Sequence, residues 1–263
     1  MRYLRLYFTY AKMSIMSKLV YKANVFIGVG AFLFGQVASL ATLFILVGSV
    51  PSLEGYTMWQ VGFLFGVVNM AVGIDHLFTD RLWTIAYFEV RQGKLDHMLL
   101  RPAPVLFQVI ASEVQLEALG EIIIAVAMLV LCGINLGTPV TLGGVLVLAL
   151  GILCAALIIS AFKVIFASFA FKFTRSGPML QFVYNFSGYV KYPMKIYPKA
   201  VQAILTFVIP LGLCLSLPFE NLLAPTYNPW LLGGTMLLST AAFAALSVLI
   251  WTKMLRLYES TGT

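Results

Sequence analysis

Three glutamates, Glu113, Glu117 and Glu121, follow one another at intervals of four within an otherwise apolar stretch. This spacing places the three carboxylates on one face of a helix, where like charges repel one another. Ionisable groups inside a membrane pair with one another or line a path for ions or protons. Two interpretations therefore stay open: an ion-pair cluster, with Lys163 and Lys172 as partners, or a proton or cation pathway.

Two motifs that support enzyme catalysis are missing from the chain. It has no Gly-x-x-x-x-Gly-Lys-[Ser/Thr] loop to hold a nucleotide and no His-Glu-x-x-His motif to hold a catalytic metal. Cys132, Cys154 and Cys214 lie in apolar segments without metal-ligand spacing, so we expect buried thiols. We expect this chain to be no enzyme and to hold no metal and no cofactor.

The composition is that of a membrane protein. Hydrophobic residues make up 61% of the chain and charged residues 10%, and the mean hydropathy is +0.95. Residues 23–53 contain no charged residue at all. About 20 apolar residues span a bilayer as a helix, and a helix satisfies its own backbone hydrogen bonds there. The fold class is therefore an all-α polytopic membrane protein.

The apolar runs predict a single transmembrane domain over 1–263. Its six expected spans are 24–48, 57–80, 105–133, 141–163, 178–192 and 230–252. Before them, Arg2, Arg5, Thr9 and Lys12 share one face of residues 1–22. This pattern predicts a helix at the membrane surface, although a basic flank of the first span is an equal alternative.

Lysine and arginine placement predicts the orientation of the chain. Positive residues occur in the N-terminal flank, at 81–101, at 163–175 and in the C-terminal tail, but not at 49–56 or 134–140. Cytoplasmic loops carry this excess, so both termini are expected in the cytoplasm. The net charge of +7 is spread over these loops, which indicates a bilayer partner and no nucleic acid.

The region that follows the start of the fifth span departs from this charge rule. It carries Lys191, Lys195 and Lys199, and the apolar run that follows is interrupted by Pro210 and Pro218. Proline breaks a helix, and the resulting short halves are typical of re-entrant segments. We favour an external turn followed by a re-entrant pair at 199–224. The alternative puts 172–198 inside and makes 199–217 the fifth span.

Two predicted spans carry patterned faces. The second has small and polar residues on one side, which suits close helix packing or contact with a substrate. The fifth has polar and aromatic residues together, which suits an apolar organic solute or, equally, another helix. The members of the face in the second span are Gly62, Gly66, Asn69, Gly73, His76 and Asp80. In the fifth span they are Gln181, Asn185, Gly188 and Tyr192, with Phe182, Phe186 and Tyr189 beside them.

A charged segment, EVRQGKLDHMLLRPAP, joins the second and third spans at 89–104. Gly93 can begin a short helix there, and Pro102 ends it because the residue before a proline avoids the helical conformation. Leu95, Met98 and Leu99 would share one side of this helix. The segment is either a solvated loop or a docking element for a partner's groove.

Two stretches carry a resemblance to a known family. GKLDHMLLRPAP at 93–104 fits the pattern Gly-x-x-Asp-x-x-Leu-x-Arg-Pro, and YPMKIYPKAVQAILTFVIPLGLCLSLP at 192–218 fits Tyr-Pro-x-x-Ile-Tyr-Pro followed by Phe-Val-Ile-Pro-Leu. With the six-span layout, they resemble a bacterial subgroup of the membrane subunits of ATP-binding-cassette exporters of the ABC-2 type. No role is assigned to His97 within the first stretch.

The resemblance implies an exporter of amphipathic or drug-like compounds in the bacterial inner membrane. Two copies of a separate ATPase subunit would bind ATP and magnesium, and a second permease chain, identical or homologous, would complete the transporter. The residues implied to couple to the ATPase are Glu89, Arg91, Gly93, Lys94, Leu95, Asp96, Met98, Leu99, Arg101 and Pro102. The implied substrate path takes Gly66, Asn69, Gly73, Gln181, Phe182, Asn185, Phe186 and Tyr189. The implied extracellular gate contains Pro193, Pro198 and Pro210.

Two other functions compete with this one. A proton-coupled secondary transporter could use Asp75 together with Glu113, Glu117 and Glu121. Such transporters often carry matching broken helices in two halves of the chain, and the sequence shows a broken helix only in the second half. A membrane-embedded lipid enzyme is the other competitor, and the lack of catalytic motifs argues against it.

Overall fold

The computed structural model describes residues 2–49, 53–138 and 141–259. The described residues form helices and turns, and no strand occurs among them apart from an isolated bridge between Leu53 and Tyr56. The predicted all-α class is therefore confirmed.

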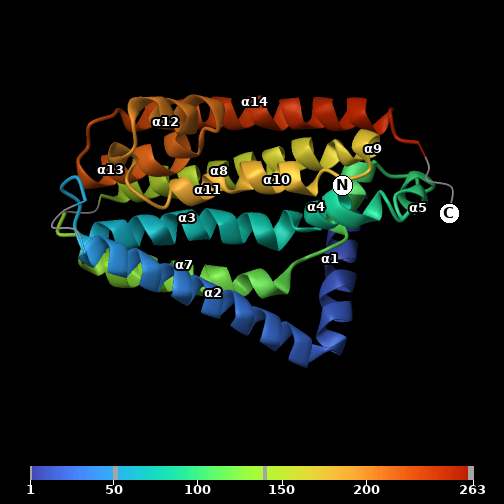
Figure 1. Ribbon diagram of the computed structural model, residues 1–263, viewed down its shortest axis with the longest axis horizontal. Coiled ribbons are helices and arrows are strands. Elements are labelled where there is room, and N and C mark those ends of the chain that lie inside the picture. The colour runs from blue at the N-terminus through green and yellow to red at the C-terminus, as the bar shows by residue number, and fades with distance from the viewer. Residues whose placement is uncertain (1, 50–52, 139–140, 260–263) are drawn as a thin grey trace.

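Five helical segments are long and apolar enough to cross a membrane, at Lys22–Gly48, Met58–Thr79, Leu116–Ile134, Leu142–Phe173 and Pro229–Leu255. They contain α2 (Lys22–Gly48), α3 (Met58–Thr79), α7 (Leu119–Ile134), α8 (Leu142–Ser168) and α14 (Pro229–Leu255). Figure 1 shows them side by side along the long axis of the molecule. In packing order they run α2, α7, α3, α8, α14, so α3 and α8 form the centre of the bundle.

Local signals set where the long helices begin. Thr57 and Gln60 form a reciprocal capping box at the start of α3. The Thr141 side chain accepts a hydrogen bond from the Gly144 N–H at the start of α8. Asn228 caps α14 just before Pro229, whose fixed φ suits the first helical position. These caps satisfy backbone N–H groups that have no partner within the helix.

The first helix, α1 (Arg2–Val20), crosses the end of the bundle at a steep angle to the long helices (Figure 1). The Tyr3 ring meets the Phe107 ring at 5.4 Å, and the Ser14 hydroxyl accepts a hydrogen bond from the Val114 N–H. If the long helices cross a bilayer, a helix at this angle lies along the membrane surface.

The predicted third span, 105–133, is wrong as a single helix. The chain forms α6 (Val105–Ala111), leaves the helical conformation at 112–115, and resumes in η2 (Leu116–Ala118) and α7. Hydrogen bonds to residues outside the segment stabilise this break. The Val114 N–H donates to the Ser14 hydroxyl, and the Gln115 N–H donates to the Leu77 carbonyl at 3.0 Å. The membrane-crossing part therefore begins at Leu116.

The chain after α8 runs through several short helices. They are α9 (Ala170–Phe173), α10 (Gly177–Tyr184), α11 (Phe186–Tyr189) and η3 (Met194–Ile196). The α10 and α11 helices lie beside α8 in the bundle (Figure 1). They occupy the predicted span 178–192, which is shorter than the five long helical segments.

A bent helix pair follows, at Lys199–Val208 and Gly212–Leu223, with 90° between its halves. It comprises α12 (Lys199–Ala203) with η4 (Ile204–Val208), then η5 (Gly212–Ser216) with α13 (Leu217–Leu223). Pro210 lies in the break. The pair occupies the predicted re-entrant region, and its sharp bend argues against a continuous span at 199–217.

The two ends of the bundle carry different segments. At one end, α4 (Arg81–Thr84), η1 (Ile85–Glu89) and α5 (Asp96–Leu99) lie close together. Tyr258, beyond α14, donates a hydrogen bond to Asp96 there, and Arg5 of α1 lines a groove together with Arg101. Both described termini therefore lie at this α5 end. At the other end, Lys195 contacts Tyr56 and Glu220, so the 192–198 turn lies beside the loop that precedes α3. An external turn before the re-entrant pair, which the sequence favours, predicts that 192–198 lies at the same end of the bundle as the 49–56 loop.

Candidate functional site

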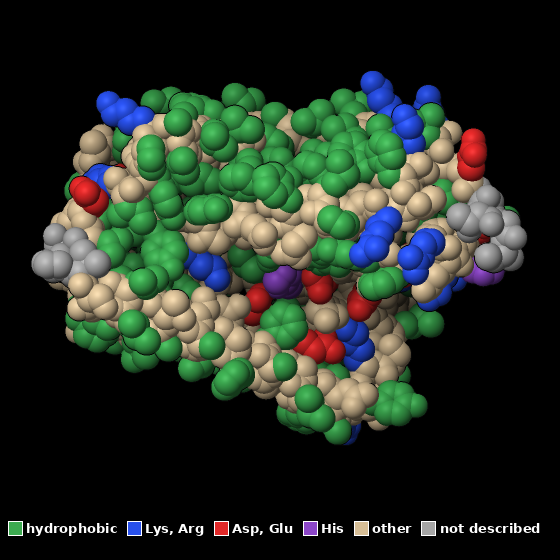
Figure 2. Space-filling model, viewed as in Figure 1, with side chains coloured by type: hydrophobic (Ala, Val, Ile, Leu, Met, Phe, Trp, Pro, Cys, Tyr) green, Lys and Arg blue, Asp and Glu red, His purple; other side chains and the backbone are tan. Residues whose placement is uncertain are grey.

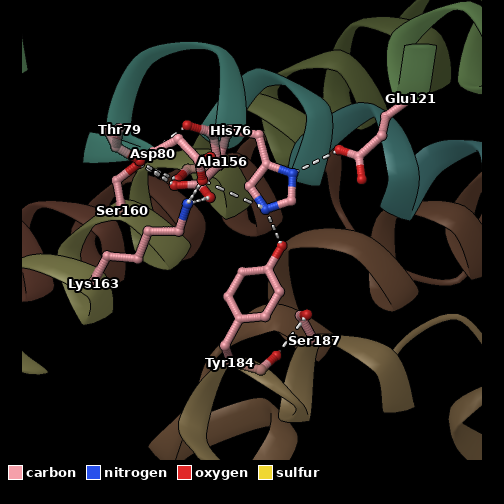
Figure 3. Close-up of polar contacts among 10 residues, drawn as sticks. His76, Thr79, Asp80, Glu121, Ala156, Ser160, Lys163, Tyr184 and Ser187 are labelled. Atoms are coloured by element: carbon pink, nitrogen blue, oxygen red, sulfur yellow. Dashed lines mark hydrogen bonds and ion pairs between the residues drawn. The ribbon is translucent and has the colours of Figure 1, made fainter. Parts of the chain in front are cut away.

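A buried ion pair joins the two central helices. The Lys163 ammonium on α8 lies 2.6 Å from the Asp75 carboxylate on α3, and the two side chains are 1% and 0% exposed. Asp80 lies 3.4 Å from the same ammonium. Thr79 and Ser160 donate hydrogen bonds to Asp75 at 2.6 and 2.7 Å. Figure 3 shows Lys163, Thr79, Ser160 and Asp80 gathered at this point. The buried charges are thus compensated by partners from both helices, which is the condition for keeping them ionised in an apolar medium.

Sequence reasoning missed this pair although a signal for it was present. Ser160 and Lys163 form a Ser-x-x-Lys spacing, which in some hydrolases marks a nucleophile beside a base. Here the Ser160 hydroxyl points to Asp75 and to the Ala156 carbonyl, while Lys163 is occupied by two carboxylates. The serine is therefore a hydrogen-bond donor to the Asp75 carboxylate, and Lys163 does not act on it as a base.

His76, beside this pair on α3, contacts two further helices directly and a third through Glu121. Its Nδ1 lies 2.7 Å from a Glu121 oxygen on α7, and its Nε2 lies 2.7 Å from the Tyr184 hydroxyl on α10 (Figure 3). The Gln36 side chain on α2 donates to the other Glu121 oxygen at 2.9 Å. The Tyr184 ring, in turn, lies 5.5 Å from the Lys163 ammonium. We call these residues, together with Asp75, Asp80 and Ser160, the polar network.

The structure corrects the predicted partners of the three glutamates. Glu113 and Glu117 contact Lys18 of α1, at 3.4 and 3.2 Å, and Glu121 contacts His76. Lys163 pairs with aspartates instead, and the Lys172 ammonium lies over the Phe173 ring. The predicted pairing with Lys163 and Lys172 is therefore wrong, because it assumed which helix faces which without knowing how each is rotated.

The polar network lies beside a hollow in the surface. Figure 2 shows acidic, basic and histidine side chains gathered in a hollow between α2 and the α10–α11 segment. The side chains of Asp80, Lys18 and Glu113 are 23%, 21% and 31% exposed. Within the described residues, no three His, Cys, Asp or Glu side chains come together as a metal site. The arrangement can contact a polar group that enters the hollow.

The residues of the predicted substrate path do not form one surface: those of α3 are packed inside the bundle, and those of α10 and α11 are mainly exposed. A Cβ added at Gly66 or Gly73 would meet α7, so these glycines serve a close helix contact. Asn69 between them is fully buried, and no hydrogen-bond partner is found for its side chain among the described residues. The fifth-span residues are mainly on the outside: Gln181, Phe182, Asn185 and Tyr189 are exposed, and Phe186 is half-buried.

The bent pair reaches the polar network. Ile209 and Leu211, on either side of Pro210, line a small cavity together with Lys163, Tyr184 and Ser187. The cavity holds about 20 Å³, which is room for one water molecule. The break in the re-entrant pair therefore rests on the same side chains that join α8 to α10.

The far end of the bent pair contacts a cluster of Tyr56, Lys195 and Glu220 at the end of the bundle opposite α5. We call these three residues the outer cluster. The Tyr56 hydroxyl donates to Glu220 at 3.0 Å, and the Lys195 ammonium lies 5.2 Å from the Tyr56 ring. These residues line a pocket of about 190 Å³. Burial, and after it the Glu220 charge, raises the pKa of the Tyr56 phenol above its ordinary value. Pro193 and Pro198 precede η3 and α12, so two of the three predicted gate prolines flank this turn.

At the α5 end, the structure divides the predicted coupling residues. Leu95 and Met98 are buried in the chain's own core, so the interpretation that they offer one side of a helix to a partner's groove together with Leu99 is wrong. Leu99 is 46% exposed and Leu100, which was not predicted, is 84% exposed. The periodicity placed the three residues on one side of a helix, but the structure turns Leu95 and Met98 inward and leaves Leu99 exposed.

The other coupling residues also fall into two groups. Arg91, Lys94, Arg101 and Pro102 are exposed. Glu89 turns inward and pairs with Arg81 at 3.1 Å, Gly93 adopts a φ of 68° that favours glycine, and Asp96 accepts the Tyr258 hydrogen bond. Burial, then the hydrogen bond to Asp96, raises the pKa of Tyr258 to about 12.

Comparison with known proteins gives one match. A family model described as "ABC-2 family transporter protein" matches residues 33–262. The matched range contains the α5 segment and the bent pair, together with all of the polar network, and it begins after α1. Neither the curated proteins nor the solved structures contain a match.

Proposed function

Because the chain belongs to the ABC-2 transporter family and is a membrane-spanning permease, we propose that it exports an amphipathic or drug-like substrate with energy from a separate ATPase. The observation that carries the proposal is the exposed surface at the α5 end. It consists of Arg91, Lys94, Leu99, Leu100 and Arg101, and we call it the docking surface. Two exposed leucines ringed by cations suit a groove with an apolar floor and an acidic rim.

The attachment of α5 would allow a push on the docking surface to move the bundle. Leu95 and Met98 lie in one core cluster with Val105 of α6, Phe171 of α9 and Trp251 of α14. Packed cores move as rigid units and do not deform continuously. When ATP and magnesium bind at two partner ATPases, their closure would displace α5, and this core would carry the displacement to the long helices.

The polar network would carry the same movement to the outer gate. Lys163 and Tyr184 join α8 to α10, and both touch the cavity at the bend of the re-entrant pair. The other half of that pair ends at Glu220 in the outer cluster. A tilt of α8 against α10 would therefore shift Pro210 and change access from outside.

A second permease chain, identical or homologous, would supply the other wall of the path. The exposed face of α10 and α11 carries Gln181, Phe182, Asn185 and Tyr189. Aromatic surface with a few amide groups suits a solute that has apolar bulk and some polarity. The glycine face of α3 is packed against α7, so α10–α11 is the wall that a single chain offers to such a solute.

The docking surface can be tested by co-purification with an ABC-type ATPase subunit produced in the same cells. We expect Leu100→Asp and Arg101→Glu each to abolish recovery of the ATPase while the permease still enters the membrane. Lys199→Glu is a matched control, because it reverses an exposed cation at the opposite end. Full ATPase recovery with both docking-surface variants would contradict the proposal.

One observation favours a second candidate, proton-coupled transport. The polar network places titratable groups on four helices, α3, α7, α8 and α10, within a bundle that is otherwise apolar. The predicted third span is also interrupted, between α6 and α7, so a discontinuous helix exists in each half of the chain. Export that continues in cells without the ATPase and stops when a protonophore collapses the proton gradient would establish this alternative. Export that requires the ATPase would exclude it.

A further inference from the structure

Two grooves meet at the α5 end, outside the polar network and beside the docking surface. The first holds about 630 Å³ and lies between α1 and the segment before α6, lined by Arg5, Leu6, Thr9, Tyr10, Arg101, Pro102 and Ala103. The second holds about 410 Å³ and lies between α6 and α14. Its lining begins at Pro104, the residue after Ala103. The two grooves therefore adjoin along one stretch of chain.

The first groove is cationic at its walls. Arg5 comes from α1 and Arg101 from the opposite side, and neither residue has an ion pair among the described contacts. Tyr10 adds a phenol from α1. Guanidinium groups bind phosphate oxygens through paired hydrogen bonds, so the chemistry of this groove fits a phosphate group.

The second groove is apolar and contains one hydrogen-bond donor without an acceptor among the described residues, the Trp251 indole N–H. It is lined by Val105, Leu106, Phe107, Ile110, Val248, Trp251, Thr252 and Leu255 in addition to Pro104. Trp251 is 1% exposed, and its indole N–H has no acceptor among the described residues. A buried N–H without a partner costs free energy. An acceptor entering the groove, such as an ester carbonyl, would remove that cost.

We propose that these two grooves bind one anionic phospholipid of the leaflet at the α5 end. The phosphate lies between Arg5 and Arg101, an ester carbonyl accepts the Trp251 N–H, and an acyl chain follows the apolar wall of α6 and α14. A phosphate, an ester and a hydrocarbon chain occur in this order in a phospholipid. Free phosphate would fill only the first groove and leave the second without an occupant.

The position of α1 gives this lipid a structural role. Helix α1 lies across the end of the bundle (Figure 1) and touches the rest of the chain through Tyr3, Ser14 and Lys18. The bound phosphate would link Arg5 of α1 to Arg101 beside α5. The lipid would thus hold the surface helix against the segment that carries the docking surface. The site does not depend on the proposed export function, and its test needs no ATPase.

The test measures lipid retained by the purified permease. Native mass spectrometry would count bound lipid after solubilisation from membranes that contain phosphatidylglycerol and phosphatidylcholine. We expect one retained phosphatidylglycerol and about fivefold weaker retention in Arg5→Gln, as expected for loss of one cation near an anionic lipid. Lys12→Gln is the matched control, because Lys12 is exposed on α1 outside the groove, and it should retain the lipid fully.

A second pair of variants tests the acyl-chain groove. Val248→Trp fills the groove from the exposed side of α14 and should reduce retention at least fivefold. Leu249→Trp places the same ring at an exposed neighbouring position that does not line the groove, and it should leave retention unchanged. Trp251→Phe keeps a ring against Phe171 and removes only the N–H, so it should weaken retention without unfolding.

Thermal unfolding of delipidated protein separates the possible sources of phosphate. Vesicles of phosphatidylglycerol should raise the melting temperature, whereas phosphatidylcholine vesicles or inorganic phosphate alone should not. The proposal is overturned if Arg5→Gln and Val248→Trp retain the lipid fully, or if phosphatidylcholine is retained equally well. It is also overturned if inorganic phosphate alone gives the same stabilisation.

Discussion

Lys163 and Asp75 form a buried ion pair of 2.6 Å between α8 and α3, and neither side chain is more than 1% exposed. Their partners, Asp80, Thr79 and Ser160, come from the same two helices. The pair therefore fixes how α3 and α8 are rotated against each other. Such a pair contributes little net stability, but removal of one member leaves an uncompensated charge in an apolar interior.

Asp75→Asn and Lys163→Met should each destabilise the protein by about 3–5 kcal/mol, because each leaves a fully buried charge without its closest partner. Asp80, at 3.4 Å from Lys163 and partly exposed, compensates the lysine only in part. The double variant should recover most of this loss. For a chain of this size the single variants correspond to a fall in melting temperature of at least about 6 °C. Lys199→Met, which removes an exposed lysine, should change nothing. Single variants as stable as this control would contradict the account of the pair.

Tyr184→Phe should destabilise the protein by about 1–3 kcal/mol, because it leaves the buried His76 Nε2 without its partner at 2.7 Å. The ring and its stacking on His76 are kept. Thermal unfolding in nanodiscs measures this effect. Tyr189→Phe removes a hydroxyl from an exposed ring and serves as the control. Equal melting temperatures for the two variants would show that the His76 contact adds nothing.

Gly151→Ala should loosen the bent pair from α8, because a Cβ there would overlap the backbone carbonyl of Cys214. Backbone cannot move aside as a flexible side chain can, so we expect a loss of at least about 1–3 kcal/mol. Gly143→Ala on the same helix meets nothing within 4 Å and should be neutral or slightly stabilising. A melting temperature of Gly151→Ala equal to that of Gly143→Ala would rule out this close packing.

Tyr258 predicts a pH dependence at the α5 end. Its pKa is raised to about 12 from the ordinary value of about 10, because burial and the hydrogen bond to Asp96 favour the neutral phenol. A group with a raised pKa contributes its stability below its unfolded pKa and loses it as the pH rises through the folded value. The contact should therefore be intact below pH 10 and weaken towards pH 12.

The difference in tyrosinate absorbance between the wild-type protein and Tyr258→Phe measures this titration. One phenol should titrate near pH 12 in the folded wild type and be missing in the variant. A midpoint near 10 for that phenol would show that the Asp96 contact does not form.

The orientation of the bundle can be measured by cysteine labelling. Cys132, Cys154 and Cys214 are buried and should react slowly, so an introduced cysteine dominates the signal. Lys195→Cys should react with an impermeant maleimide added to intact cells, and Arg91→Cys should react only after permeabilisation. The opposite pattern would invert the protein and place the docking surface outside.

Sequence patterns predicted α2, α3, α8 and α14 well, because each is a long apolar run with clear boundary residues. They failed at the break before α7. The hydrogen bonds that stabilise this break come from Ser14 and Leu77, and no local pattern encodes partners so far along the chain.

The candidate site was less predictable than the fold for a similar reason. The spacing of Glu113, Glu117 and Glu121 showed that their side chains share a face, and each does contact a polar partner. Which partner each contacts depends on helix rotation, so Lys18 and His76 were not identified. In the same way, the spacing of Leu95, Met98 and Leu99 defined a face but left its inward side undetermined.

We infer that an ATPase drives this permease through the docking surface. A photo-crosslinking amino acid at position 100, where the native leucine is 84% exposed, tests it most directly in intact cells. We predict a covalent adduct with the ABC-type ATPase on illumination, and none when the same group replaces Trp230, which is 89% exposed at the start of α14. Absence of any ATPase adduct at position 100, with the ATPase present and export active, would contradict the account.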